Sequence, residues 1–472
     1  MRRLVCWILM AVMLLTALPA VANAEKTSGL FTYEIKGNGT VTVTDFDWQA
    51  NGSNDIYIPN MLDGYTVTGI GNEAFLYDED EVNANSVSMV LSNNITTIGE
   101  KAFWNSNLAS INIPDGVRDI GYGAFVGFEG HITMSNTHPV FAVIDGNLYH
   151  KQRKELLYYR GTVFTEMGAV VGGIVPEGIK SIGDYACYGR YIVATGEKTE
   201  PPFWGVFPST LTSIGDYAFY GSEFQPDTYV SHATAPFIIP EGVSVIGEYA
   251  FAWSTHWNAQ IVLPSTLETL GNSAFFRLRK SSNRNDLEAY PLPYSIEVIF
   301  SPNTVLKSVP ENCFSTGIDR QTASVDASQT QLESIGEYAF SGVRRIILPE
   351  TISELGENCF QDAYSWNEAI IIPEKVKAIP EGAYQVADMQ FHGNENEINL
   401  AQTEKIESLA FAGRVIADLY LPDTVKYIAI DAFDKRSTFV VEAGSYAELW
   451  CQENGFIYTV KGTEQNLDWL NN

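Results

Sequence analysis

Residues 237–251 read FIIPEGVSVIGEYAF and contain both halves of a pattern that recurs along the chain. The second half, Ile-Gly-x-x-Ala-Phe, occurs in thirteen clear or looser copies between Ile70 and Phe433, among them IGEKAF (98–103) and LGENCF (355–360). Successive copies lie 20 to 62 residues apart, and several spacings fall between 20 and 24 residues. A unit of this length, extended by insertions, is typical of a solenoid.

The first half of the pattern is a pair of alternating apolar residues followed by Pro, as in INIPDGV (111–117) and LYLPDTV (419–425). Alternation predicts a short strand, which Pro ends because it has no N–H to donate. The Val-x-x-Ile-Gly stretch then returns the chain on the other side, and Ala and Phe enter the interior. Gly is present in nine of the thirteen copies, where it holds either a positive φ or a close-packed bend.

These motifs resemble the BspA-like leucine-rich repeats of bacterial surface proteins, and the resemblance covers nearly the whole mature chain. It implies a curved solenoid of stacked parallel strands, opened by a stretch such as residues 29–46 and closed by one such as residues 445–460. It also implies a secreted or surface-bound protein that binds other macromolecules. It does not imply which ligand is bound.

Residues 1–24 are predicted to be a secretory signal peptide. Arg2 and Arg3 precede an apolar run, and Ala22-Asn23-Ala24 is a small-residue cleavage site. Retention of the run as an anchor is the alternative. No later stretch has the length of a membrane span. We therefore expect a monomer that is secreted or loosely associated with the cell surface after cleavage near Ala24.

The mature chain is predicted to contain a solenoid between two caps. Residues 25–48 form the N-terminal cap around a hairpin turn at 37–39. Residues 49–436 form the solenoid, of about thirteen repeats, with a hairpin insert near 137–162 that turns at 145–146. Residues 437–472 form the C-terminal cap, with a helix that begins after Ser445 and ends at Gly455. Polar caps are needed because an open solenoid exposes its apolar interior at each end.

The composition restricts the partners. Cleavage leaves 27 basic residues against 57 acidic ones, a net charge of −30. Such acidity argues against nucleic acid and anionic membranes, which need a basic face. Solubility explains the charge, and calcium binding in an acidic loop such as 78–81 is the sharper alternative. We expect no metal and no cofactor.

The cysteines follow the repeat pattern. Cys187 stands in the Phe position of the motif, and Cys313 and Cys359 stand in the Ala position. Each is therefore expected to be a small buried hydrophobic residue with a free thiol. The alternative is a disulfide between Cys313 and Cys359, which is the one pair for which the sequence leaves this possibility.

The sequence contains no pattern that predicts catalysis. The histidines fall in linkers without metal-ligand spacing, and there is no nucleophile elbow and no phosphate loop. A pair of carboxylates that converges only in space is the remaining enzymatic alternative. We expect a protein that is not an enzyme.

Two sets of residues are candidates for ligand binding. The residue between the two core-facing positions of each strand must point outward. These positions are Tyr57, Asn112, Ile174, Val206, Ile238, Val262, Ile347, Ile371 and Tyr420. Such a row is either a binding face or a result of strand propensity alone. Aromatic residues in the insertions form the second set: Trp104, Phe203, Trp204, Trp253, Trp257 and Trp366.

The loop aromatics either stack on sugars and anchor proteins or pack back over the solenoid edge. The expected function is adhesion to host or neighbouring-cell macromolecules, with an extracellular protein or glycan as the partner. The strongest candidate positions are Tyr57, Ile238, Val262, Ile347, Ile371 and Tyr420, together with Trp204, Trp253 and Trp257. The alternative is a carbohydrate-binding protein that uses the aromatic loops.

Overall fold

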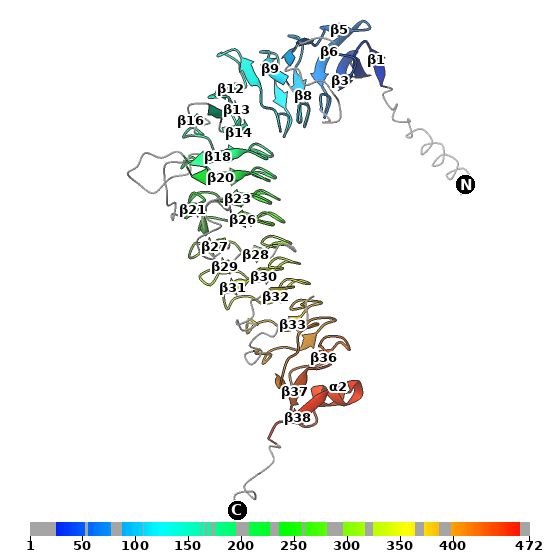
Figure 1. Ribbon diagram of the computed structural model, residues 1–472, viewed down its shortest axis with the longest axis vertical. Helices are drawn as coiled ribbons and strands as arrows, with labels where there is room; N and C mark the ends of the chain where they lie inside the picture. Colours follow the sequence, from blue (N-terminus) through cyan, green and yellow to red (C-terminus); the bar gives the residue numbers. More distant parts are fainter. Residues whose placement is uncertain are drawn as a thin grey trace, which may run out of the picture. The chain divides into compact units, whose positions relative to one another are not determined.

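The computed structural model describes most of the chain between residues 25 and 462 (Figure 1). The described ranges are 25–51, 55–76, 87–106, 108–161, 163–165, 168–170, 175–194, 207–226, 236–256, 260–280, 296–316, 324–363, 372–386 and 398–462. The predicted signal peptide and the acidic loop 78–81 lie outside them. Two compact units divide between Val143 and Ile144, inside the predicted insert. The strand β12 (Phe141–Ile144) spans this division.

The first unit contains the predicted N-terminal hairpin and the first repeats. Its larger sheet has the order β1 (Lys26–Ser28), β2 (Phe31–Ile35), β3 (Thr40–Phe46), β6 (Tyr65–Ile70), β8 (Thr97–Ile98) and β10 (Asp119–Ile120), with β5 (Met61–Leu62) beside β6. The strands β2 and β3 pair antiparallel, as expected for the hairpin, whereas β3 and the strands that follow on this path pair in parallel. A second parallel sheet has the order β4 (Asp55–Tyr57), β7 (Val87–Val90), β9 (Leu108–Ile113) and β11 (His131–Met134).

In the second unit each repeat contributes short strands to separate parallel ladders. The Ile of the motif lies in β17 (Ser181–Ile182), β19 (Ser213–Ile214), β22 (Val245–Ile246) and β25 (Thr269–Leu270), which follow the hairpin β13 (Asn147–His150) and β14 (Glu155–Tyr158). This ladder position continues in β28 (Ser308–Val309), β30 (Ser334–Ile335) and β32 (Glu354–Leu355), and then in β33 (Ala378–Ile379), β34 (Lys405–Ile406) and β36 (Tyr427–Ile428).

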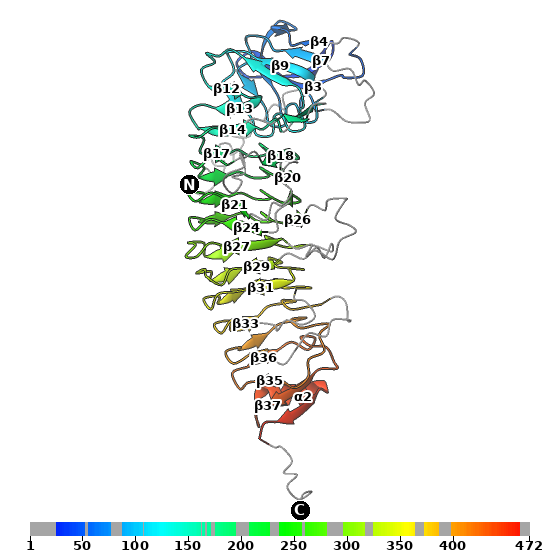
Figure 2. The ribbon, with the colours of Figure 1, turned by 60° about the vertical axis from the view of Figure 1, so that its left-hand side comes forward.

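The strands in the first half of the repeat pattern form a second ladder, seen as a vertical stack in Figure 2. Its order is β21 (Phe237–Ile238), β24 (Gln260–Leu263), β27 (Glu297–Phe300), β29 (Ser324–Asp326) and β31 (Arg345–Ile347). A third ladder follows the motif Phe in β18 (Tyr191–Ala194), β20 (Glu223–Pro226), β23 (Thr255–His256) and β26 (Arg279–Lys280). The pair β15 (Val163–Thr165) and β16 (Gly168–Val170) is antiparallel.

Insertions enter the long repeats between the third and the second ladder. Residues 227–236, for example, connect β20 to β21, and residues 281–296 connect β26 to β27. The 20-residue repeat that ends at Phe360 has no such segment, because only residues 341–344 separate Phe340 from β31.

The interior of the second unit is an unbroken stack of motif rings. Adjacent ring centroids lie 5.0 to 5.9 Å apart, with interplanar angles of 2° to 23°. The stack runs through Phe219, Phe251, Phe275, Phe314, Phe340, Phe360, Tyr384, Phe411 and Phe433. The prediction that the motif Phe fills the core is thus confirmed. A shorter stack in the first unit joins Phe75, Phe103 and Phe125.

The motif Gly is a close-packed bend rather than a left-handed residue. A Cβ on Gly121 would lie 2.4 Å from the backbone N of Glu100 in the preceding repeat. The left-handed residue is instead the one before Ala, in twelve of the thirteen copies. At Tyr217 (φ 55°) this turn directs the N–H to the carbonyl oxygen of Glu248 in the next repeat, at 2.8 Å. The repeats are therefore joined by backbone hydrogen bonds at their turns as well as in the ladders.

The C-terminal end of the described chain has the predicted helix and strands. The helix α2 (Tyr446–Asn454) is capped by Ser445, whose hydroxyl accepts from the Glu448 N–H at 3.1 Å, and by Gly455 in the left-handed conformation. It packs beside the sheet β35 (Leu419–Leu421), β37 (Thr438–Val441) and β38 (Ile457–Val460).

The four cysteines of the described chain are buried and free, as predicted. One repeat, with Ala339 at the equivalent position, separates Cys313 from Cys359. The backbone N–H of Phe314 donates to the Ala339 carbonyl, and the backbone N–H of Phe340 donates to the Cys359 carbonyl. Burial raises the pKa of both thiols.

Candidate ligand-binding surface

The outer face of the β21–β31 sheet carries one row of mainly apolar side chains. Cα pairing aligns Ile238, Val262, Ile299, Asp326 and Ile347 across the five strands. The neighbours of these residues along each strand, such as Phe237 and Ile261, are fully buried. We name these five aligned residues the outer row. The sequence analysis placed Ile238, Val262 and Ile347 in this row, and the structure brings them into one sheet.

The outer row differs from its prediction in two members. Ile299 and Asp326 were missed because Pro does not directly follow their strands: Ser301 separates Phe300 from Pro302, and Ala327 is followed by Ser. Ile238 is 54% exposed, whereas Val262, Ile299 and Ile347 are half-buried. Asp326 interrupts the apolar character, and its carboxylate accepts from the Ser328 N–H at 3.0 Å.

A polar row lies beside the outer row on the same face. It consists of Gln260, Glu297, Ser324 and Arg345, which are aligned by the same pairings. The Gln260 amide donates to the Glu297 carboxylate at 2.8 Å. The face thus combines apolar contact area with a polar rim, an arrangement found at protein interfaces.

The remaining predicted strand positions do not join the outer row. Tyr57, which is 62% exposed, belongs to the first unit, where it aligns with Val90 and Asn112. Tyr420 lies in the separate C-terminal sheet, and its hydroxyl donates to Glu442 at 2.6 Å while the Lys461 ammonium lies 4.4 Å from its ring. Ile174, Val206 and Ile371 lie outside the described residues, as do Phe203, Trp204, Trp257 and Trp366.

A second surface feature lies at the turns of the Gly-x-x-Ala-Phe motif. Tyr217 stacks between Tyr185 and Tyr249, with ring centroids 4.9 and 5.0 Å away. Tyr188 and Tyr220 stack in the same way at 5.0 Å. These five residues, the tyrosine ridge, were not selected from the sequence, although their recurrence at equal motif positions is a readable signal.

Tyr217, in the middle of the tyrosine ridge, has no free ring face. Both faces of Tyr217 are covered by neighbouring rings, so no sugar can stack on it. Burial, followed by the charge of Glu248 and the neighbouring tyrosines, raises the pKa of Tyr217 to about 12. Its phenol therefore stays protonated at neutral pH and can donate a hydrogen bond.

Trp253 is the one predicted loop tryptophan of the strongest set that the structure describes. Its half-buried indole contacts two cations, since the guanidinium carbons of Arg277 and Arg279 lie 4.6 and 4.8 Å from the ring centroid. Phe276 contacts the indole edge-on at 6.2 Å. Trp104 in the first unit is similarly paired with the Lys101 ammonium at 5.1 Å.

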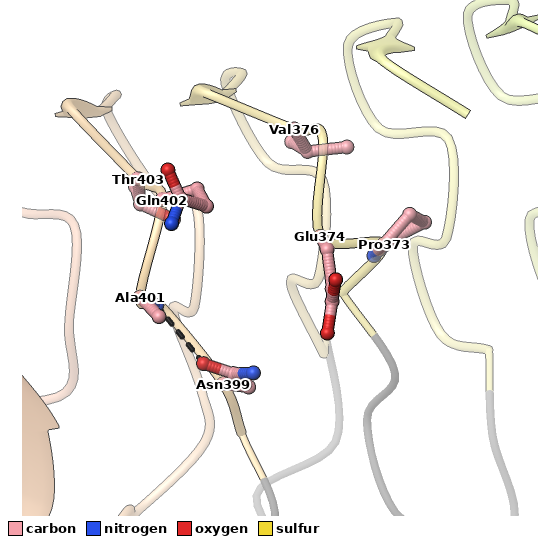
Figure 3. A pocket seen from close by; sticks show the side chains of 7 residues that line it. All are labelled: Pro373, Glu374, Val376, Asn399, Ala401, Gln402 and Thr403. Carbon is pink, nitrogen blue, oxygen red and sulfur yellow. Dashed lines mark hydrogen bonds between the residues drawn. The ribbon is translucent and has the colours of Figure 1, made fainter. Parts of the chain in front are cut away.

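A small polar groove opens between two turns of the second unit (Figure 3). Its volume is about 120 Å³, and Pro373, Glu374, Val376, Asn399, Ala401, Gln402 and Thr403 line it. In an earlier repeat, the equivalent Glu forms hydrogen bonds to the turn of the next repeat: the Glu241 carboxylate accepts from both the backbone N–H and the hydroxyl of Ser265. Ala401 stands where that serine would be and its N–H bonds to Asn399 instead, which leaves the groove open.

In the part of the chain that the structure describes, no group of three or more His, Cys, Asp or Glu could hold a metal ion. Within the same ranges, no helix is long and apolar enough to cross a membrane.

The repeat geometry agrees with a known family. The family described as BspA type leucine-rich repeat region (6 copies) matches residues 54–150, 224–316 and 307–440. The chain belongs to this family. The outer row and the Trp253 cluster therefore lie within BspA-type repeats, whereas Tyr185, Tyr188, Tyr217 and Tyr220 lie between two matched ranges.

Solved bacterial structures are similar over most of their length. A leucine-rich cell surface protein from Faecalibacterium prausnitzii is 16% identical, with 90% of this chain and 96% of that chain covered and a TM-score of 0.40. A leucine-rich repeat protein from Eubacterium ventriosum is 13% identical, with 83% and 95% covered and a TM-score of 0.37. One from Bacteroides ovatus is 19% identical, with 88% and 99% covered and a TM-score of 0.29. Among curated proteins, none matches the chain.

Proposed function

We propose that this BspA-type protein is a secreted or loosely surface-associated, non-enzymatic adhesion protein. Its outer row binds an extracellular macromolecule of a host or neighbouring cell. The observation that carries the proposal is the alignment of Ile238, Val262 and Ile299 on three adjacent strands, with Ile238 54% exposed. A partner that lies along the sheet contacts several repeats at once.

The chemistry of the face favours a protein partner. Apolar side chains that are held on strands lose little conformational entropy on binding, and the polar row beside them supplies hydrogen-bonding groups. Burial of the outer row depends little on ionic strength, because salt screens charges and not apolar contacts. The proposed site is on a rigid scaffold, so binding requires no rearrangement of the described strands.

The test compares residues 25–472 with the double variant Ile238→Asp/Val262→Asp on extracellular-matrix and glycan arrays. We expect the parent to bind at least one extracellular component and the double variant to lose that binding. Both side chains point away from the core, so the circular dichroism spectrum should not change. The matched control is Asn272→Asp/Asn303→Asp, which adds the same two negative charges at exposed positions of the same unit outside both rows and should bind normally.

Retention of full binding by the double variant would contradict the proposal. So would loss of binding at modest salt, because that result would assign the interaction to surface charges. The carbohydrate-binding alternative through Trp204, Trp253 and Trp257 finds one supporting observation, the half-buried indole of Trp253 at a turn of the second unit. The two cations on that indole make a neutral sugar a poor fit and point to a different ligand.

A further inference from the structure

Trp253 and Arg277 have a left-handed backbone conformation at a motif position where most other left-handed residues are glycine. Both stand two residues after the motif Phe and have φ of 58° and 52°. At this motif position, five repeats have a left-handed glycine: Gly127, Gly189, Gly221, Gly342 and Gly413. Asn105 and Asp362, of the residue types that tolerate this region, complete the left-handed set. A bulky side chain is disfavoured in this region, so Trp253 and Arg277 are not the residues that the backbone alone would select.

The left-handed backbone directs both side chains to one spot. The backbone N–H of Trp253 donates to the carbonyl oxygen of Phe276 at 2.8 Å, and the backbone N–H of Arg277 donates to the carbonyl oxygen of Ser315 at 2.8 Å. The backbone N–H of Arg279 donates to the carbonyl oxygen of Ser254 at 2.9 Å. Consecutive repeats thus place an indole and two guanidinium groups together, with Phe276 5.3 Å from the Arg277 guanidinium.

The guanidinium of Arg277 has no anionic partner among the described residues. No carboxylate of these residues lies within 4.0 Å of its nitrogens, although the chain has 57 acidic residues. The Nε atom is buried and makes no hydrogen bond in the described part of the chain. An arginine has five N–H donors in a planar fork, so this group lacks the acceptors that normally satisfy it. The side chain is half-buried, and an incoming ligand can reach its terminal nitrogens.

We propose that Arg277 and Trp253 form a binding site for an oxyanion on an acidic glycan, either a sulfate ester or a uronate carboxylate. The guanidinium fork matches the two oxygens of such a group. Trp253 holds the fork in place through its ring face, and Arg279 adds positive charge to the same spot. Both groups are therefore preorganised for the anion.

The surroundings select a glycan over denser polyanions. The chain is strongly acidic, so a nucleic acid with its closely spaced phosphates is repelled around this spot. A glycan carries fewer charges, separated by hydroxyl groups. Tyr249, a member of the tyrosine ridge, lies on the same turn as Trp253, and the phenols of the ridge can form hydrogen bonds to those hydroxyls.

Isothermal titration of residues 25–472 at low ionic strength tests the site with three probes. These are a κ-carrageenan hexasaccharide, which carries sulfate esters but no carboxylates, an oligogalacturonate hexamer, which carries carboxylates but no sulfates, and neutral chitohexaose. We expect one or both acidic probes to bind and chitohexaose not to bind. Preference between the two acidic probes then identifies sulfate or carboxylate as the anion.

The decisive variant is Arg277→Gly, because glycine accepts the left-handed backbone without strain. It should weaken the acidic probe at least tenfold while the Tm stays equal or rises. Arg277→Lys should also weaken binding several-fold, since an ammonium lacks the fork. Arg344→Gln, which removes an exposed arginine elsewhere in the same unit, is the control and should bind like the parent.

Three results would overturn the assignment. One is equal binding by Arg277→Gly and the parent, and another is a lowered Tm for Arg277→Gly, which would make the arginine structural. The third is equal binding of a poly-glutamate peptide through Arg277, which would replace the glycan by an acidic protein. The Ile238→Asp/Val262→Asp variant should bind the acidic probe normally, so failure at this site is separable from failure of the outer row.

Discussion

The Nε2 atom of His256 lies 2.8 Å from the hydroxyl oxygen of Ser254 in the core of the second unit. The Ser254 hydroxyl donates its only hydrogen to the Phe251 carbonyl at 2.6 Å, so His256 must be the donor to Ser254. The proton of the neutral ring is therefore on Nε2. The Nδ1 atom is buried and has no hydrogen-bond partner among the described residues. A second proton on this ring would have no acceptor.

We expect acid to destabilise the second unit through His256. Burial lowers its pKa from 6.5 to about 3, so between these values the unfolded chain binds a proton that the folded chain does not. The contribution of the neutral His256 to the free energy of unfolding is complete above pH 6.5. It falls by about 1.4 kcal/mol for each pH unit below 6.5, down to the pKa of the folded state. Amide exchange of residues 236–280 as a function of pH measures the loss.

Replacement of His256 measures how much of the pH dependence of stability this residue causes. His256→Phe, whose ring can still stack on Phe224, should flatten the pH dependence between 6.5 and 4 relative to the parent. His131→Phe removes an exposed histidine of the first unit and should leave the dependence in residues 236–280 unchanged. An unchanged slope in His256→Phe would show that carboxylates alone produce it.

Truncation of one stacked ring should weaken the second unit strongly. Phe251 is fully buried and stacks between Phe219 at 5.0 Å and Phe275 at 5.2 Å. Phe251→Ala should cost about 3 to 5 kcal/mol, because it removes contacts with two neighbours and leaves a cavity. Chemical denaturation measures the loss, and unfolding should lose two-state character. A variant as stable as the parent would contradict the repeat alignment.

A methyl group on a motif glycine should separate two repeats of the first unit. In Gly121→Ala the new Cβ would lie 2.4 Å from the Glu100 N and 2.7 Å from its Cα, so the backbone must move. We expect a loss of about 1 to 3 kcal/mol. Gly37→Ala, at a site with no atom within 4 Å, is the control and should be neutral or slightly stabilising. Thermal unfolding of the two variants should differ in sign or clearly in size.

Two arginines near the C-terminus should differ in their effect on stability. Arg414 is buried, and its guanidinium donates to the carbonyls of Tyr384 at 2.6 Å and Ala363 at 3.1 Å, in two preceding repeats. Arg414→Ala should cost about 2 to 4 kcal/mol. Arg436 makes an ion pair with Asp434 at 2.8 Å but is 54% exposed. Arg436→Ala should therefore cost much less stability than Arg414→Ala, because an exposed ion pair contributes little. Equal losses in denaturant titrations would refute this ranking.

Much of the repeat follows directly from the sequence. The alternation before Pro predicts the strands of the outer ladder, and the equal spacing of Phe219 and Phe251 predicts that they share a core. The caps were predictable because Gly37–Gly39 and Ser445 are local signals. The left-handed residue before Ala was not, since Tyr217 and Leu409 are poor indicators of that conformation. Only the hydrogen bond to the next repeat explains it.

The candidate sites were partly predictable. Strand alternation was enough to place Ile238 and Val262 on one face. Ile299 required the pairing of β24 with β27, because its strand lacks the adjacent Pro. Trp253 was selected as an aromatic residue, but the contact with Arg277 depends on two repeats that stack with equal motif positions side by side. Comparison of residues two places after each Phe would have found it.

The entry point of the insertions has a consequence for the history of this gene. Lengthening the segment between β20 and β21, or between β26 and β27, leaves the ring stack and the backbone bonds between turns intact. The entropic cost of a longer loop grows only slowly with its length. A single in-frame duplication or exchange can therefore alter what one repeat displays, while its neighbours need no compensating mutations. These segments are therefore the part of the chain that can change with the least effect on the fold.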